Sequence, residues 1–163
     1  MKMEQLHKVV DTRELLESYR ELLPQVDTLP LVVSGNSMSP FLVHGRDTVH
    51  LAAPGARPLQ KGDIVLYQRE DGSYILHRIC GVSSTVPPAY SIIGDAHTVV
   101  ERNVRREQIF AVVKWVDRKG KRQAPGSFWW EFFARVWVRM IPLRRPLLRA
   151  YTSLCHKRGR RIQ

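Results

Sequence analysis

The sequence predicts a mainly β protein in which an antiparallel sheet is preceded by one helix and followed by further helices. Short β-branched and aromatic runs, separated by turn signals, recur between residues 29 and 117, and this pattern is typical of antiparallel strands. Apolar residues before and after this region repeat instead with a helical period. With 163 residues the chain is long enough for one domain with its own core, and a second full domain would not fit beside it.

The first predicted element is an N-terminal helix within residues 1–28. Its apolar positions approximate one helical face: Leu6, Val9, Val10, Leu15, Leu16, Tyr19 and Leu22. The helix begins either near residue 3 or at Asp11, a candidate N-cap, and Pro24 ends it. Charged residues occur throughout residues 1–24, so this segment has the pattern of neither a secretory signal nor a transmembrane anchor. We therefore expect a cytoplasmic or peripheral-membrane protein.

Six strands are expected in the central domain, residues 29–117. They are Leu31–Val33, Thr48–Leu51, Ile64–Tyr67, Tyr74–Val82, Tyr90–Ile93 and Ile109–Asp117. Glu70-Asp71-Gly72 has the composition of a hairpin turn between the third and fourth strands, and Pro87-Pro88 marks a loop. Their regular spacing indicates neighbouring strands in one antiparallel domain.

The C-terminal quarter differs in charge from the rest of the chain. Residues 118–163 carry 13 Lys or Arg and one acid, Glu131, whereas residues 1–117 carry 13 Lys or Arg and 14 acids. We interpret residues 118–126 as a basic linker and residues 127–163 as an aromatic and basic helical tail. Glu131, Arg135 and Arg139 fall four residues apart, which on a helix makes one polar stripe along an otherwise apolar rod.

These charges argue against a membrane span in the tail, because a span needs about 20 mostly uncharged residues. The aromatic and basic composition favours an interfacial helix on an anionic membrane surface. The alternative is packing of the aromatic face on the β domain or on a partner protein, and nucleic-acid binding is the least favoured reading.

Candidate chemistry begins at the turn Val33–Pro40, whose sequence is V-S-G-N-S-M-S-P. A serine in a tight glycine-containing turn after a strand can expose its hydroxyl, and neighbouring backbone N–H groups then stay free to bind an oxyanion. Ser37 is therefore a candidate nucleophile, although most such turns have no catalytic role.

A serine nucleophile needs a base, because its hydroxyl is not ionised at neutral pH. His77 lies in the predicted strand Tyr74–Val82, on the same face as Ile75 and Ile79. Most histidines on such a face are core residues, but partial burial also keeps imidazole neutral, as a general base requires. The Gly94-Asp95 turn after the next strand offers the Asp95 carboxylate to orient His77.

The order of the motifs resembles the signal peptidase I and LexA superfamily of serine peptidases. S-G-N-S-M-S-P is followed by K-G-D-I-V-L-Y, Y-I-L-H-R-I and I-I-G-D-A, and the similarity covers roughly residues 31–116. The resemblance implies a coiled antiparallel sheet, Ser37 as nucleophile, His77 as base and Asp95 as the carboxylate of the Gly-Asp motif. Histidine in place of lysine resembles the archaeal and endoplasmic-reticulum type signal peptidases. That branch often has a second acid, for which Glu101 is the nearby residue.

The nucleophile turn is closer to the LexA-type pattern. Signal peptidases usually carry a serine two residues before the nucleophile, where this chain has Gly35. The resemblance therefore implies an oxyanion hole made by the backbone N–H groups of Asn36 and Ser37. Met38 and Pro40 are the expected substrate-binding residues, with internal packing as the favoured alternative for Met38.

We expect a serine endopeptidase that cleaves leader or signal segments of peptides or proteins. One alternative is a LexA-type self-processing regulatory protein, for which Ala52-Ala53 and Ala124 are weak candidate cleavage sites. Another is a non-catalytic peptide-binding module of the same fold. No cofactor is expected, and the spacing of the histidines and the two cysteines indicates no metal site.

Overall fold

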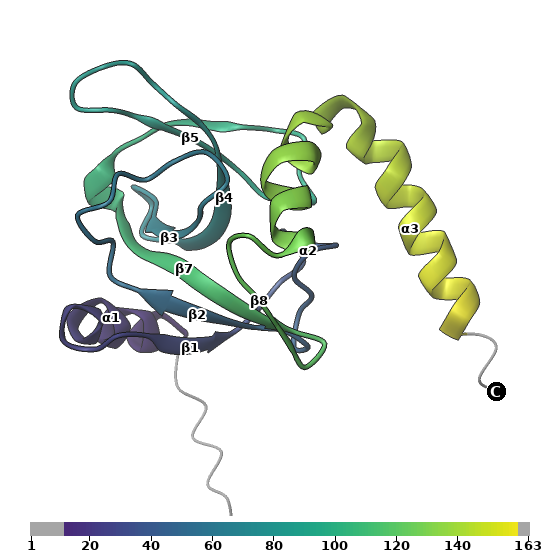
Figure 1. Cartoon of the computed structure of the whole chain (residues 1–163), viewed down its shortest axis with the longest axis horizontal. Helices are drawn as coiled ribbons and strands as arrows, with labels where there is room; N and C mark the ends of the chain where they lie inside the picture. Colours follow the sequence, from purple (N-terminus) through teal and green to yellow (C-terminus); the bar gives the residue numbers. More distant parts are fainter. Residues whose placement is uncertain (1–11, 160–163) are drawn as a thin grey trace, which may run out of the picture.

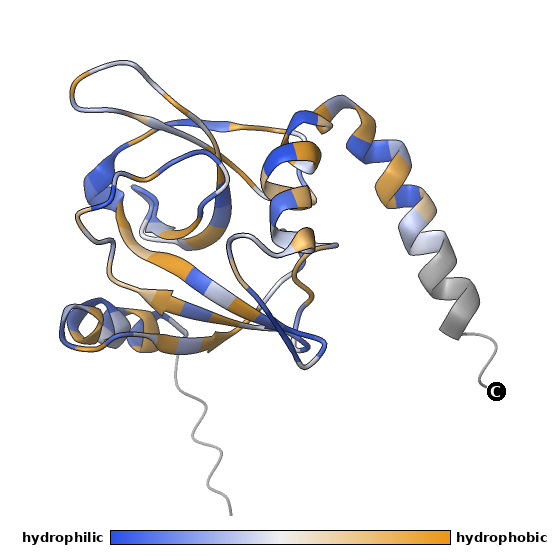
Figure 2. Ribbon diagram, viewed as in Figure 1, coloured by the Kyte–Doolittle hydropathy of each residue, from blue (hydrophilic) through white to orange (hydrophobic). Residues whose placement is uncertain are grey.

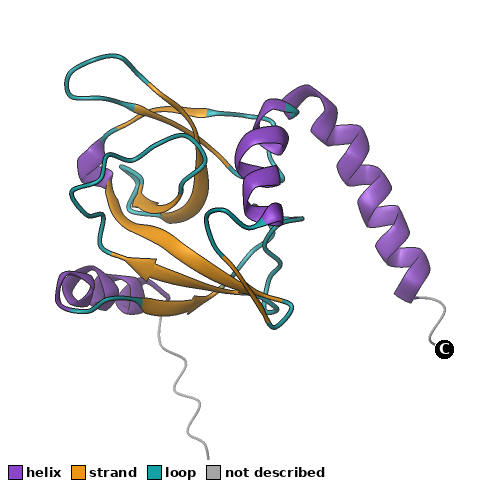
Figure 3. Ribbon diagram, in the orientation of Figure 1, coloured by secondary structure: helices purple, strands orange, loops and turns teal. Residues whose placement is uncertain are grey.

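The computed structural model describes residues 12–159, with side chains described up to residue 153, and eight strands form one antiparallel sheet within that part of the chain (Figures 1 and 3). The strands are β1 (Leu29–Val32), β2 (Thr48–Ala52), β3 (Ile64–Gln68), β4 (Tyr74–Val82), β5 (Tyr90–Ile93), β6 (Glu101–Val104), β7 (Ile109–Arg118) and β8 (Lys121–Gln123). Their order is β1-β2-β7-β3-β4-β5-β6, with β8 paired to β7. The predicted mainly β fold with flanking helices is confirmed.

Apart from one 3₁₀ turn before β7, the helices lie before β1 and after β8. They are α1 (Thr12–Leu22) followed by a 3₁₀ turn (Leu23–Gln25), a 3₁₀ turn before β7 (Arg106–Gln108), α2 (Phe128–Glu131), a π-helical turn (Phe132–Val136), two 3₁₀ turns (Trp137–Arg139 and Ile141–Leu143) and α3 (Arg144–Gly159). The N-terminal helix is present from Thr12, and its predicted earlier part lies outside the described residues. Leu16 is the residue that α1 buries in the core.

Two strands were not predicted from the sequence. β6 (Glu101–Val104) and β8 (Lys121–Gln123) are short and mostly polar, so they lack the apolar alternation that marks a strand. The predicted linker at residues 118–126 is in fact largely the β7–β8 hairpin, in which Val116 pairs with Gln123 and Arg118 with Lys121. Lys119 and Gly120 form its turn with φ of 50° and 72°, as a two-residue hairpin turn requires.

The predicted helical rod Ser127–Ile141 is a chain of short helical turns that belongs to the core. We call residues 128–143 the aromatic segment. Trp130, Phe133 and Trp137 are buried in the same apolar cluster as Phe41, and the Phe133 and Phe41 ring centroids lie 4.9 Å apart. Of the three interpretations of the tail, packing on the β domain therefore holds for this face of the segment.

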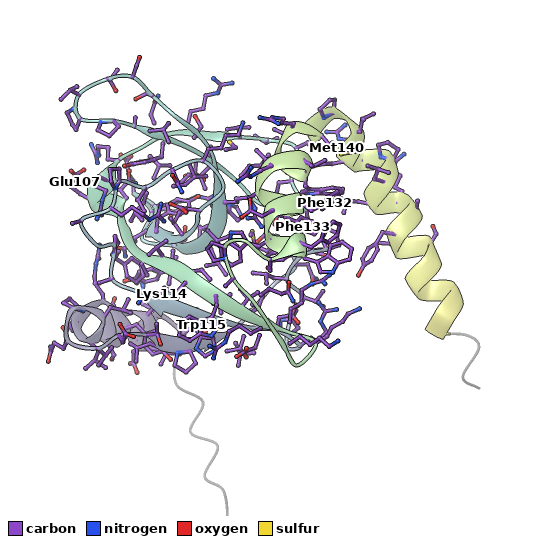
Figure 4. All side chains as sticks on the ribbon, in the orientation of Figure 1. Glu107, Lys114, Trp115, Phe132, Phe133 and Met140 are labelled. Atoms are coloured by element: carbon purple, nitrogen blue, oxygen red, sulfur yellow. The ribbon has the colours of Figure 1, made fainter. Side chains whose placement is uncertain are left out.

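The aromatic segment approaches the sheet closely because Gly62 has no side chain. A Cβ on Gly62 would lie 2.9 Å from the Cβ of Ala134, too close for an ordinary contact. Figure 1 shows this segment between the sheet and α3, which is the outermost helix. Phe132 and Phe133, labelled in Figure 4, come from it.

α3 carries alternating basic and apolar side chains, visible as bands in Figure 2. Its apolar residues Leu147 and Tyr151 are exposed. Within residues 12–159, no helix is both long enough and apolar enough to cross a membrane.

Candidate active site

The turn that carries Ser37 follows β1 and is held by hydrogen bonds to the next loop. Gly35 has a φ of 79°, in the left-handed region that glycine adopts without strain. Its N–H donates to Nδ1 of His44 over 3.1 Å, and the Val33 N–H donates to the carbonyl of Asp47 over 2.9 Å. These bonds fix the direction in which the chain leaves β1 toward Ser37.

Asp47 anchors the far end of the same loop. Its buried carboxylate accepts hydrogen bonds from the N–H of Val43 at 2.9 Å, from the Arg46 guanidinium, and from the N–H of Lys119 in the β7–β8 turn at 3.3 Å. The hydrogen bonds from Arg46, Val43 and Lys119 hold the pKa of Asp47 below its usual value, although burial acts in the opposite direction as the largest single effect. The nucleophile loop is thus tied to the core strand β7.

Ser37 is half-buried at the tip of this turn. Within the described part of the chain, no protein group accepts a hydrogen bond from the N–H of Asn36 or of Ser37, or from the Ser37 hydroxyl. Asn36 is exposed and Ser37 is half-buried, so both N–H groups are accessible donors. The oxyanion hole at Asn36 and Ser37 stays a prediction.

The other two predicted substrate-binding residues lie differently. Met38 is buried in the main apolar cluster with an exposed fraction of 2%, so it packs inside the protein, as the alternative prediction held. Pro40 is half-buried, and its carbonyl accepts a weak hydrogen bond from Arg118 at 3.4 Å. The side chain of Met38 is therefore not presented to a bound peptide.

His77 is buried in β4, where it pairs in register with Val65 of β3. Desolvation, followed by the repulsion of His97 and Arg69, lowers the pKa of His77 to about 4, and only Glu101 acts to raise it. The imidazole is therefore neutral at physiological pH. Its Nδ1 is buried and has no hydrogen-bond partner among the described residues.

Gly94 is the point at which Ser37 and His77 meet. A Cβ on Gly94 would lie 2.6 Å from the carbonyl oxygen of Ser37, 2.9 Å from Nε2 of His77 and 3.0 Å from Nδ1 of His97. Three groups from the β1–β2 loop, from β4 and from the loop after β5 therefore converge on one spot. The edge of His77 that carries Nε2 faces this spot, and no described hydrogen bond occupies Nε2.

Asp95 does not contact His77, contrary to the expectation that it orients the base. Its two carboxylate oxygens accept hydrogen bonds from Nε and Nη2 of Arg78 at 3.0 and 2.9 Å. Both side chains are fully buried, and Arg78 also donates to the carbonyl of Gly62 at 3.1 Å. The physical reason is strand alternation: Arg78 and His77 are adjacent in β4, so they point to opposite faces, and Asp95 lies on the Arg78 face.

Glu101, the other candidate acid, opens β6 and sits in a polar group beside His77. Its carboxylate accepts hydrogen bonds from the Tyr67 hydroxyl at 2.7 Å and from the Arg69 guanidinium at 2.6 to 3.1 Å. Desolvation is the largest single effect and raises the pKa of Glu101. The hydrogen bonds from Arg69 and Tyr67, followed by the charges of Arg69 and His77, together outweigh it and hold this pKa below its usual value. Of the two acids, Glu101 is the one that interacts electrostatically with the base.

Two further residues reach the site from the C-terminal quarter, and neither was predicted from the sequence. The Trp137 indole N–H donates to the carbonyl of Asp95 at 2.7 Å. Arg144 donates to the carbonyls of Gly94 and His97 at 2.9 and 2.8 Å. Only a pattern linking an aromatic tail to the Gly-Asp turn across more than 40 residues would have revealed these contacts, and single-sequence periodicity contains none.

The described residues contain no group of three or more His, Cys, Asp or Glu side chains placed to hold a metal ion. The sequence matches no protein family model, and no curated protein matches it. The site is therefore interpreted on its own geometry.

Proposed function

We propose that the protein is a serine endopeptidase of signal-peptidase-like type, with Ser37 as nucleophile and His77 as general base. One observation carries the proposal: the main-chain carbonyl of Ser37 and the free Nε2 edge of His77 both lie against Gly94, so the two residues are neighbours in space. The free N–H groups of Asn36 and Ser37 support it, because they supply the donors that acyl transfer requires. The order of motifs in the sequence supports the same assignment.

In this mechanism Nε2 of His77 takes the proton of the Ser37 hydroxyl as Oγ attacks the carbonyl carbon of the scissile bond. The oxyanion that forms is stabilised by the backbone N–H groups of Asn36 and Ser37. The imidazolium then returns the proton to the leaving amine as the C–N bond breaks. A water molecule hydrolyses the acyl-enzyme, with His77 again accepting and returning a proton.

Glu101, rather than Asp95, is the acid that we assign to the support of His77. Glu101 raises the pKa of His77, which means that its negative charge favours the imidazolium formed during attack. Asp95 forms a fully buried ion pair with Arg78. Its role is to hold the turn that contains Gly94.

The substrate would lie extended along β1, which is the outer strand at one end of the sheet order. β1 leads into the nucleophile turn, and beside it a cleft of about 370 Å³ separates α1 from the β3–β4 hairpin and reaches Ser34. The walls of this cleft are mostly apolar, including Leu15, Leu31 and Leu76. Such a cleft fits a peptide with apolar side chains on the N-terminal side of the cleaved bond.

Cleavage of a mixture of defined peptides, followed by mass spectrometry, tests the proposal. We expect the full-length protein to cleave a subset of peptides at one type of position, and the Ser37→Ala and His77→Ala variants to lose this activity. Ser39→Ala, which alters a nearby serine outside the dyad, is the matched control and should cleave like the parent protein. Equal cleavage by the parent protein and Ser37→Ala would overturn the assignment.

The self-processing alternative receives less support from the structure. Ala52 is buried in β2 and pairs with Val112 of β7, so the Ala52-Ala53 bond is held at the end of a paired strand and is not accessible. Ala124 follows β8 and is half-buried. Incubation of the purified protein would yield two fragments if this alternative held, and we expect one intact mass.

For the C-terminal quarter we propose contact with an anionic membrane surface through its outward face. Phe128 and Trp129 are exposed by 72% and 43% and their rings pack against each other. Arg118 stacks over Trp129, and exposed Arg135 and Arg139 lie on the same segment. Aromatic rings next to arginines are typical of the interface between headgroups and acyl chains.

Vesicle flotation tests this contact. The full-length protein should float with vesicles rich in phosphatidylglycerol and stay unbound with pure phosphatidylcholine. The reason is that such binding depends on attraction between the basic side chains and anionic headgroups. The double variant F128S/W129S should lose flotation, whereas V86S/V99S, which removes two even more exposed apolar residues elsewhere, should keep it. Failure of the parent protein to float, or binding to duplex DNA instead, would overturn the membrane proposal.

A further inference from the structure

The loop of residues 94–97 is the element that joins Ser37 to His77. The Ala96 N–H donates to the carbonyl oxygen of Ser37 over 2.9 Å, and Gly94 packs against both Ser37 and His77. The His97 ring stands perpendicular to the His77 ring, with centroids 5.2 Å apart. A shift of this loop would therefore move the nucleophile relative to the base.

Two side chains from the C-terminal quarter hold the opposite side of this loop. Arg144 Nη1 donates to the carbonyls of Gly94 and His97 at 2.9 and 2.8 Å, and Trp137 Nε1 donates to the carbonyl of Asp95 at 2.7 Å. Three of the four carbonyls in the loop are thus bound by donors from the aromatic segment and the start of α3. Figure 1 shows that these elements flank the sheet on the side of α2.

Arg144 is an unusual residue for a position that only fills space in the core. It is fully buried, yet its hydrogen bonds all go to carbonyl oxygens, including that of Trp137 at 3.0 Å, and the carboxylate of Asp95 acts on it only through its charge. Burial of a charged group without a hydrogen-bonded opposite charge is costly. The planar guanidinium can, however, bind several carbonyls in fixed directions, which an apolar side chain of the same size cannot do.

We propose that Arg144 and Trp137 are positioning residues of the peptidase site, which set the place of Ser37 relative to His77 through the 94–97 loop. This inference rests on the proposed function. It means that the C-terminal quarter completes the active site, in addition to any surface that it offers to a membrane. The contacts act on backbone carbonyls, so the substrate-binding cleft beside β1 should be little affected.

The test compares full-length R144M, R144K and W137F with two controls. V138A removes buried apolar volume from the same segment, since Val138 is buried and its side chain cannot form a hydrogen bond to the loop, and R145Q alters the adjacent, exposed arginine. W137F keeps most of the apolar ring but removes the N–H donor. R144K keeps the charge but not the fork of donors.

We expect R144M and W137F to lower kcat about 100-fold, because a displacement of about 1 Å has effects of this order, with KM changed less than about threefold. R144K should fall between R144M and the parent protein. V138A and R145Q should keep the parent kcat even where V138A lowers the melting temperature as much as W137F. Parent-like kcat in both R144M and W137F would overturn the inference.

Amide hydrogen exchange at Ala96 gives a second readout that needs no activity, because its N–H is the donor to Ser37. Exchange there should accelerate at least tenfold in R144M and W137F and stay unchanged in V138A, relative to the β7 amides in each variant. Were the parent protein inactive, the proposed function would fail, but the exchange rates would still decide whether these residues hold the loop. Unchanged exchange at Ala96 in R144M and W137F would contradict that role.

Discussion

The strand framework and the aromatic segment both contribute to the candidate active site, but they differ in how the sequence encodes them. The framework carries Ser37 and His77 on elements built by local pattern, β1 with its turn and β4. The aromatic segment has an equally strong local pattern, yet the environment of its buried residues Trp130, Phe133 and Trp137 depends on tertiary contacts. These contacts are with Phe41 and with the 94–97 loop. The comparison shows that a segment with the composition of a surface tail can be part of the hydrophobic core.

The largest effect should come from breaking the buried ion pair inside the framework. Arg78→Met leaves Asp95 charged and buried without its partner, and we expect a loss of about 3–5 kcal/mol in the free energy of unfolding. Urea denaturation of R78M measures it. Arg57→Met, at the exposed partner of Asp63, is the control and should cost less than about 1 kcal/mol.

An effect of similar order should arise in the aromatic segment if it is truly core. Phe133→Ala removes a buried ring that packs on Phe41, so the free energy of unfolding should fall by at least about 3 kcal/mol. Phe128→Ala, at the exposed neighbour, should change it by less than about 0.5 kcal/mol. Equal, small losses in both variants would mean that the segment is a tail after all.

Where the two regions meet, adding one methyl group at Gly94 should displace the nucleophile relative to the base. Gly94→Ala places its Cβ against Ser37 and His77, and we expect kcat/KM to fall about 100-fold because the dyad is displaced. Gly55→Ala is the matched control, since its Cβ would meet no atom within 4 Å. If G94A were as active as G55A, Gly94 would not mark the catalytic contact.

The smallest effect is the pH dependence that burial imposes on His77. Because the folded pKa is about 4 rather than 6.5, the base should stay neutral and kcat/KM should vary less than about twofold between pH 5.5 and 7.5. Activity should fall only as the pH drops through about 4. Between pH 6.5 and 4 the unfolded chain binds the proton more readily than the folded one, so this group makes stability rise with pH across that window. An activity midpoint near 6.5 would show that His77 is hydrated.

Most of the framework could be predicted from the sequence, because alternation and turn chemistry are local properties. Tyr74–Val82 has the same bounds as β4, and His77 lies on the buried face that alternation indicates. β6 and β8 were missed because Glu101–Val104 and Lys121–Gln123 are strands through pairing with β5 and β7, not through their own apolar pattern.

The site was predictable where it follows from local position and not where it depends on tertiary partners. The turn of Ser37 and the strand of His77 are local features. The partner of Asp95 could not be deduced from sequence, because Arg78 and His77 are neighbours and only the fold decides which face Asp95 meets. The contacts of Arg144 and Trp137 could not be predicted for the same reason, since their partners are backbone carbonyls that are distant in the sequence.

The most direct test of the central claim is labelling of the full-length protein with a fluorophosphonate, which modifies activated serine hydroxyls, followed by peptide mapping. The account predicts that Ser37 alone carries the adduct and that His77→Ala and Gly94→Ala suppress its formation, whereas Ser39→Ala and Gly55→Ala do not. An adduct on another serine, or labelling of Ser37 that is equally fast in His77→Ala, would contradict a Ser37–His77 dyad.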